Sequence, residues 1–437
     1  MKLGGSKLLL SVVALLAVMP AGAAPLTLEA ALEKALVRHP DAEMARARVM
    51  EAEARYAEAR SGNLPRLDGR ISYMQTTNPV QAFGTILNQG TFDNTIDFND
   101  PGQLDSLTAG LETRYRVYSG GGRTAHIKSA ESMRMAGEQS LSATESGLED
   151  AVVAAYFGIR QADDIVRSIE AGIRVLEENL RISKIREESG ELIRTERLNL
   201  EVELATLQRE LLGSQHQATL ARLQMAFLLG EPAGAGIVLA EADPSVERIA
   251  PPPTLSIENR PELQAARAAA EATTHGIRAA KAGYQPTVDA YASWQSDKGW
   301  RREGDGSSWT AGLVMNVPIF DGSATRARVS AARAQERAAM EAVRRMELVL
   351  NIELEQARLG HELAIAQKGV AEKQLLQAEE AAQLSRERFA AGTLLSTELI
   401  GVESRLTDAR VQLALATSQE RSALAHLRRV AGYPVLN

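Results

Sequence analysis

The chain carries one pattern twice, and this duplication constrains the fold more than any other feature. In the first part of each copy, matching residues lie 221 positions apart, as in His39-Pro40-Asp41 and Arg260-Pro261-Glu262. From residue 108 onward the separation is 202, and it holds for these pairs: Gly120 and Gly322, Gly190 and Gly392, Glu196 and Glu398, Gly230 and Gly432. The second part of each copy therefore has no net insertion or deletion. The extra residues of the first copy lie between residues 75 and 107. We expect turns there rather than a helix, within an extracellular loop, because the segment contains Asn78-Pro79, Asn88-Gln89-Gly90 and Asn99-Asp100-Pro101-Gly102.

Each copy reads helix, strand, loop, strand, long helix, turn, helix. We predict a first repeat at residues 24–230, a linker rich in Pro and Gly at 231–256, and a second repeat at 257–437. The first repeat has strands near 66–74 and 108–119, a long helix at 122–189 and a return helix at 193–229. The second has strands near 287–295 and 309–320, a long helix at 323–391 and a return helix at 396–430. A leading helix is expected from about Thr27 to Ser61, and its copy from about Ile257 to Gly283.

The strand segments alternate between apolar and charged residues. In the first of them, Leu67, Ile71 and Tyr73 alternate with charged or polar neighbours such as Asp68 and Arg70. A strand between lipid and a watery lumen has this pattern. A strand that covers the core of an ordinary soluble sheet has it too, so the strands alone do not distinguish these two structures.

The helices favour the membrane channel. The segment from Ser323 to Ala390 has 68 residues and would be roughly 100 Å long at 1.5 Å per residue, longer than a compact domain accommodates. The return helices carry apolar residues at alternating spacings of three and four, which indicates coiled-coil packing. Four strands cannot close a barrel, and an open sheet would leave unsatisfied edges in lipid. We therefore predict a mainly α fold with a small β part. Its duplicated unit contributes four strands to a pooled membrane β-barrel, which is joined to a long periplasmic α-helical coiled-coil barrel.

The N-terminus and the composition limit the other possibilities. Residues 1–23 have the features of a secretory signal peptide, with Lys2 and Lys7, an apolar stretch, and a small-residue site ending at Ala23. The chain has no cysteine, its net charge of −7 disfavours nucleic acid as a partner, and its six histidines lack ligand spacing. With no catalytic constellation either, we expect no enzyme activity, metal or cofactor.

Three motifs identify a family resemblance. They are Tyr118-Ser119-Gly120-Gly121, Phe320-Asp321-Gly322, and Arg388-Phe389-Ala390-Ala391-Gly392-Thr393 ahead of Glu398. In this order and spacing the chain resembles the TolC family of outer-membrane efflux channels over essentially its whole mature length. The resemblance implies a homotrimer in outer-membrane lipid, with a helical barrel extending into the periplasm. It also implies a periplasmic adaptor (membrane fusion protein) and an inner-membrane pump as partners. The chain would then be the passive exit duct of a tripartite efflux or type I secretion system.

The resemblance also implies functional positions. The turns at Gly190 and Gly392 would form the periplasmic tip, where the channel narrows and the adaptor docks. Thr195 and Glu196 match polar residues that bridge neighbouring coils in the closed state, and Glu398 matches an acidic residue that constricts the aperture.

Two gate positions depart from the family pattern. Phe389 stands where a Tyr hydroxyl would bond, and Leu394 stands where an Arg would. A closing network in this chain must therefore be wired differently.

Two other function classes remain as alternatives. A periplasmic coiled-coil adaptor or scaffold without a pore would also have helical hairpins, although it would not need two sets of strands with a charged face. A general diffusion porin is disfavoured because the helices far outnumber the strands. The sequence does not indicate the cargo.

Overall fold

The computed structural model describes residues 25–97 and 99–436, so the predicted signal peptide lies outside the described residues. The first repeat comprises α1 (Leu28–Arg38), α2 (Pro40–Ser61), β1 (Arg66–Thr76), α3 (Pro79–Asn88), β2 (Leu104–Tyr118), α4 (Gly122–Glu188) and α5 (Arg194–Leu228). The second comprises α6 (Pro261–Lys281), β3 (Thr287–Lys298), β4 (Asp305–Asn316), α7 (Ala324–Ala390) and α8 (Ser396–Val430). Short 3-10 turns lie at η1 (Pro244–Arg248) and η2 (Ala282–Tyr284).

The duplication recurs helix by helix. α4 and α7 have 67 residues each, and α5 and α8 have 35 each. The bounds of each pair differ by 202 at both ends, the separation that the sequence predicts. The predicted fold class, mainly helical with a small antiparallel sheet, is confirmed.

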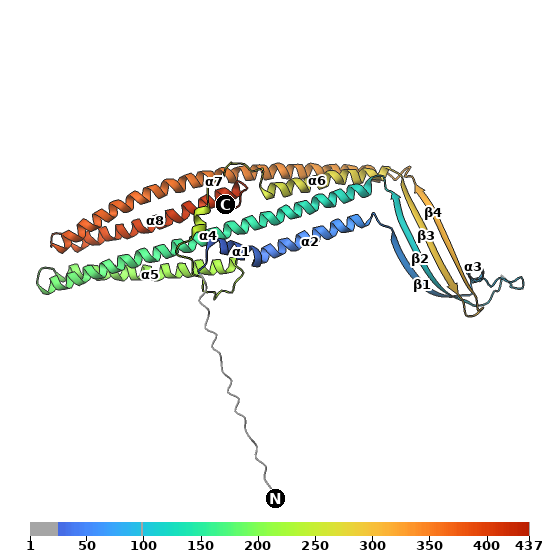
Figure 1. Ribbon diagram of the computed structural model, residues 1–437, viewed down its shortest axis with the longest axis horizontal. Coiled ribbons are helices and arrows are strands. Elements are labelled where there is room, and N and C mark those ends of the chain that lie inside the picture. Colours follow the sequence, from blue (N-terminus) through green and yellow to red (C-terminus); the bar gives the residue numbers. More distant parts are fainter. Residues whose placement is uncertain (1–24, 98, 437) are drawn as a thin grey trace, which may run out of the picture.

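The helices form one curved layer with the sheet at one end (Figure 1). α4 and α7 run from the sheet to the far tip. α2 and α5 lie end to end along α4, while α6 and α8 lie end to end between α4 and α7. The layer therefore has α2 and α5 at one edge and α7 at the other. Ala357, Ala364 and Ala371 are buried on α7 at intervals of seven residues, the spacing of coiled-coil packing.

The four strands form one antiparallel sheet in chain order, so β1 and β4 are its edges. The register places Gly69, Leu111, Trp294 and Trp309 in one row across the sheet. The next row holds Asp68, Glu112, Ser293 and Thr310. Residues directly opposite each other share a face. The apolar and polar sets therefore keep to separate faces across all four strands.

The long loop of the first repeat contains a helix, which corrects our expectation of turns alone in residues 75–107. Asn78 and Pro79 begin α3, since the Asn78 side chain accepts hydrogen bonds from the amides of Val80 (3.0 Å) and Gln81 (3.3 Å). The apolar face of α3 then packs its buried Ile86 on Leu104 of β2. A turn signal in the sequence is here a helix start.

The leading helix is also divided, contrary to our expectation of one helix from Thr27 to Ser61. α1 ends at Arg38 and α2 begins at Pro40. His39 between them is extended (φ −69°, ψ 132°), because a residue before proline is disfavoured in the helical region. The copy behaves in the same way, since Arg260 is extended and α6 begins at Pro261.

The main hydrophobic core lies at the middle of the molecule, where α1, the ends of α5 and α8, and the linker pack against α4. Asp243 of the linker accepts hydrogen bonds from the Tyr156 hydroxyl of α4 (2.6 Å) and from the Leu28 amide that begins α1 (2.7 Å). In the described part of the chain, no helix is both long and apolar enough to cross a bilayer. No group of His, Asp and Glu side chains in that part is arranged to hold a metal ion.

Candidate gate at the tip of the helical hairpins

The two hairpin turns have the same backbone. Gly190 and Gly392 follow the ends of α4 and α7 with φ of +80° and +77°. The amides of Glu191 and Thr393 reach back to the carbonyls of Arg186 (2.8 Å) and Arg388 (2.9 Å). This is the Schellman ending, which needs a left-handed residue that glycine adopts without strain. The glycines are thus explained by the turn itself.

An apolar cluster joins the two hairpins near the tip. The second hairpin supplies Phe389, Leu394 and Leu399, with exposed fractions of 0%, 9% and 0%. The first hairpin supplies Ile169, Ile173, Leu176, Leu200 and Leu207. Phe389 and Leu394, two of the predicted gate residues, therefore hold the hairpins together by burial.

Arg186 adds a polar link between the hairpins. Its guanidinium donates to the Phe389 carbonyl (2.8 Å) and lies over the Phe389 ring, 5.6 Å from the centroid. A Cβ at Gly392 would meet the same guanidinium at 2.8 Å. Arg186 is not among the residues predicted from the sequence, because an arginine near a helix end has the same sequence pattern as a solvated charge.

Glu196 bridges the two return helices. Its carboxylate accepts from the Ser396 amide (2.7 Å) and from the Ser396 hydroxyl, and Ser396 is fully buried. Two turns further along, Glu203 accepts from the Ser404 hydroxyl (2.9 Å). We call these four residues the Glu–Ser latch. Because Glu196 lies at the first amide of α8, it also supplies the N-terminal cap of that helix.

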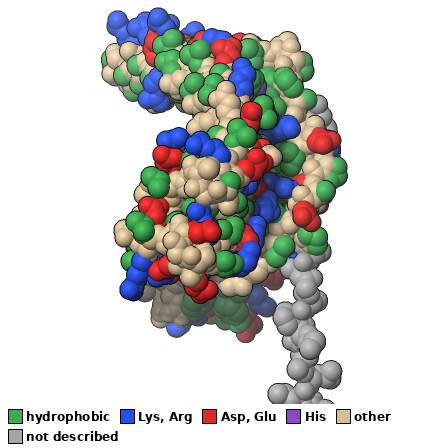
Figure 2. All heavy atoms as spheres, turned by 90° about the vertical axis from the view of Figure 1, so that its left-hand side faces the viewer, with side chains coloured by type: hydrophobic (Ala, Val, Ile, Leu, Met, Phe, Trp, Pro, Cys, Tyr) green, Lys and Arg blue, Asp and Glu red, His purple; other side chains and the backbone are tan. Residues whose placement is uncertain are grey.

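The remaining predicted gate residues lie apart from the latch. Thr195 and Glu398 are exposed on the surface of the chain. Viewed from the tip end, acidic and basic side chains are interspersed over both hairpins (Figure 2). The structure thus brings Glu196, Phe389 and Leu394 into the contacts between the hairpins, and it leaves Thr195 and Glu398 facing outward.

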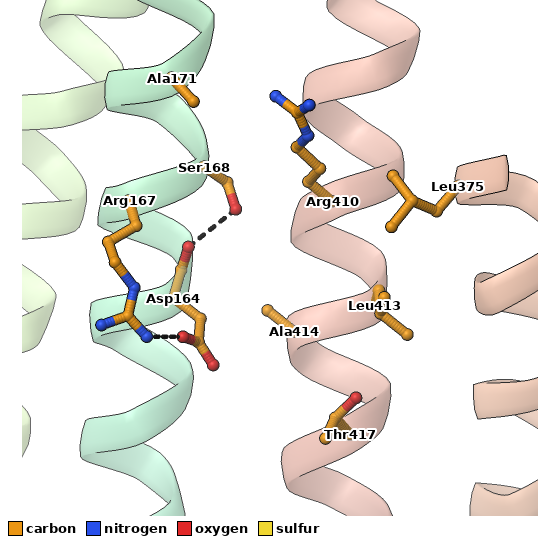
Figure 3. Close-up of a pocket in the computed structure, with 9 residues that line it drawn as sticks. All are labelled: Asp164, Arg167, Ser168, Ala171, Leu375, Arg410, Leu413, Ala414 and Thr417. Carbon is orange, nitrogen blue, oxygen red and sulfur yellow. Dashed lines mark hydrogen bonds and ion pairs between the residues drawn. The ribbon is translucent and has the colours of Figure 1, made fainter. Parts of the chain in front are cut away.

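The two hairpins also approach each other farther from the tip, between α4 and α8. A Cβ on Gly172 of α4 would lie 2.8 Å from the Thr407 hydroxyl of α8. One to two turns farther from the tip, a cavity of about 370 Å³ opens between the same helices (Figure 3). α4 contributes Asp164, Arg167 and Ser168 to its walls, and α8 contributes Arg410 and Leu413.

Comparisons with known proteins agree with this architecture. The family model described as "Outer membrane efflux protein" matches residues 31–231 and 253–433. Among curated proteins, "Pyoverdine export outer membrane protein OpmQ" of Pseudomonas aeruginosa is 27% identical over 403 residues, covering 90% of this chain and 82% of that protein. "Fusaric acid resistance protein FusA" of Burkholderia cepacia is 28% identical over 308 residues, covering 68% of this chain but only 56% of that protein.

Solved structures of outer-membrane channels share the fold. A structure of CusC superposes with a TM-score of 0.80 at 17% identity, covering 93% of this chain and 92% of that one. The channel VceC of Vibrio cholerae gives a TM-score of 0.77 at 19% identity, with coverages of 93% and 96%.

Proposed function

This chain belongs to the outer membrane efflux protein family, and we propose that three copies of it form the outer-membrane exit duct of an efflux or secretion machine. One observation carries the proposal: the sheet and the helical layer end in free edges on matching sides. β1 and the α2/α5 line form one side, and β4 and α7 form the other. A rotation that pairs β4 with the next β1 also packs α7 against the next α2/α5 line. Repetition around an axis closes both layers together.

The exposed face of α7 supports closure by a neighbouring copy. Leu348, Ile352, Leu359, Leu363 and Val370 are all more than half exposed, at spacings of four and seven residues. Because this pattern recurs every eleven residues, about three helical turns, the five side chains stay on one face of α7. Its counterpart α4 packs against helices on both of its sides. An apolar stripe of this length is typical of an interface, and the α2/α5 line of the partner subunit is the occupant we propose.

The duplication predicts the contacts across that boundary. Within one chain, Gly172 of α4 meets Thr407 of α8. At the repeat separation of 202, Gly172 corresponds to Gln374 of α7 and Thr407 corresponds to Ala205 of α5. The equivalent contact between subunits therefore joins Gln374 to Ala205 of the partner subunit. The same operation acts on the Glu–Ser latch. Glu196 and Ser396 become Glu398 and Arg194 of the partner subunit.

We therefore propose a role for Glu398 as a cap on the neighbouring chain. In the described part of the molecule, Ile193, the N-cap of α5, makes no side-chain capping bond, and α5 begins at Arg194. A carboxylate there would accept from the Arg194 amide and pair with its guanidinium. The closed tip would then alternate bonds within and between subunits. The Gly190 and Gly392 turns beyond it are where we propose that a periplasmic adaptor docks and couples the duct to an inner-membrane pump.

The absence of cysteine makes the ring directly testable. We expect the double variant Ala205→Cys/Gln374→Cys, oxidised in outer membranes, to give covalently linked trimers on a denaturing gel. Each single-cysteine variant should remain monomeric on that gel. A matched control pairs Ala205→Cys with Arg337→Cys, which lies 37 residues away on α7, about 55 Å along the helix. A largest product of two chains would refute the three-fold ring, and an absence of linked products would refute the interface.

A further inference from the structure

The polar face of the sheet lines a hollow of about 1230 Å³ at the membrane end of the molecule. Most of its charges lie on β1 and β2. Arg66 stands directly opposite Arg114, and Asp68 stands directly opposite Glu112. Like charges directly opposite each other destabilise a ladder. The ion pairs instead run along each strand, joining Arg66 to Asp68 (3.0 Å) and Arg114 to Glu112 (2.9 Å). Two more acids lie on this face: Asp289 pairs with Arg116 (2.9 Å), and the buried Asp297 accepts hydrogen bonds from Thr108 and Gln295.

Arg70 is the arginine of the described strands that these ion pairs leave without a partner, whereas Arg123 of α4, which also lines the hollow, donates to the carbonyls of Gly62 and Arg116. The side chain of Arg70 is exposed in the hollow, and its cross-strand neighbour is Gly110. Among the described residues it forms no ion pair or hydrogen bond. The duplication gives its other neighbour in the ring. Arg114 and Tyr291 are paired within one chain. At the repeat separations Arg114 corresponds to Asn316 and Tyr291 to Arg70, so Asn316 of the partner subunit would stand beside Arg70. Arg70 would therefore have uncharged side chains directly opposite on both sides.

The second repeat shows that the strands do not need these arginines. At the repeat separations, Arg66 corresponds to Thr287, Arg70 to Tyr291 and Arg114 to Asn316. The corresponding strands form the same antiparallel hairpin without the positive charge. The arginines of β1 and β2 are therefore additional to the requirements of the fold.

We propose that Arg70, flanked by Arg66 and Arg114, forms an anion-binding belt on the inner face of the membrane sheet, and that it takes small cargo bearing carboxylate groups. Three copies of an unpaired guanidinium around one watery axis create a positive potential that low-dielectric walls focus into the pore. Guanidinium groups bind carboxylates through two parallel hydrogen bonds. The belt deepens the proposed function and rests on its ring. It gives the outer end of the duct a preference for anions.

The test uses the full-length trimer in planar bilayers, with the tricarboxylate citrate added on the extracellular side. We expect citrate to reduce the current of the unmodified protein. In Arg70→Gln, half-block should require about tenfold more citrate, since a charge-assisted hydrogen bond of about 1.5 kcal/mol is lost. The reversal potential in a KCl gradient should also shift toward cations. Lys298→Gln is the matched control, because its place in the register puts it on the opposite face of the sheet.

The outcomes separate the belt from the duct. Citrate block that is the same in a conducting Arg70→Gln trimer and in the unmodified trimer would overturn the belt and leave the exit duct standing. An unmodified protein that assembles no conducting trimer would overturn both. If Lys298→Gln lost as much citrate block as Arg70→Gln, the effect would depend on the net charge of the protein alone, and this result would also refute a specific belt.

Discussion

Glu196 and Glu398 occupy the same place in the two copies, yet their surroundings within one chain differ. Glu196 is held by buried Ser396, whereas Glu398 is exposed at the start of α8. Two glutamates at equivalent positions of the repeat therefore differ: the carboxylate of Glu196 has hydrogen-bond donors within the chain, and the carboxylate of Glu398 is exposed. In the ring that we propose, this difference would disappear, because each Glu398 would reach the first turn of α5 in the next copy. The exposed acid then has a structural partner as well as a charge.

A double-mutant cycle on Glu398→Gln and Arg194→Gln tests this pairing. Each single change should raise the single-channel conductance of the otherwise closed trimer, because it removes a bond between subunits at the tip. The double variant should differ little from either single variant, since both changes break the same bond. Effects that simply add would mean that the two side chains act independently. A change in ion selectivity at constant conductance would favour the alternative, a ring of Glu398 charges at the aperture.

The scale of whole elements shows how far the sequence determines this fold. The repeat separations predict the lengths of the long helices, because every inserted residue would break the common register. They do not predict α3, since Asn78-Pro79 has the composition of a turn. Its helix is stabilised by Leu104, which is distant in the sequence. The same limit applies at the tip. Phe389 and Leu394 are visibly apolar, but their partners Ile173 and Leu176 lie in the other repeat.

The contact between α3 and β4 gives a prediction at the scale of whole elements. A Cβ at Gly306 of β4 would lie 2.0 Å from the Asn88 carbonyl oxygen at the end of α3. Gly306→Ala should therefore displace α3 from the sheet, and the amides of residues 80–88 should exchange with solvent at least tenfold faster. Gly84→Ala is the control within α3, because in the described structure its Cβ would meet nothing within 4 Å and alanine favours the helix. Unchanged amide exchange in Gly306→Ala would contradict this prediction and show that the strand accommodates the methyl group while α3 stays packed on the sheet.

At the scale of the whole molecule, stability depends on the main core at the middle of the chain, where the linker packs against helices of both repeats. Burial alone would raise the pKa of Asp243, but hydrogen bonds from Ser245, from the Tyr156 hydroxyl and from the Leu28 amide outweigh it, so its pKa is lowered. Burial, together with the hydrogen bond to Asp243, raises the pKa of Tyr156 to about 12, so the phenol remains a neutral donor. One carboxylate thus joins α1, α4 and the linker over the physiological pH range.

The sign of this shift fixes the last prediction. A carboxyl whose pKa is lower in the folded protein stabilises the fold above its unfolded pKa of about 4, and the contribution is lost as the pH falls through the folded value. Asp243→Asn should therefore cost about 1–2 kcal/mol at pH 7, because an amide replaces a charged acceptor of several hydrogen bonds. Thermal melts of the detergent-solubilised protein, followed by circular dichroism, should show the two proteins converging as the pH is lowered from 5 toward 3. Glu241→Gln, an exposed neighbour on the same segment, should melt like the unmodified protein at both ends of that range. If Asp243→Asn were less stable than the unmodified protein by the same amount at every pH, its effect would come from lost packing. A contribution from the carboxylate charge must disappear as the carboxyl is protonated at low pH.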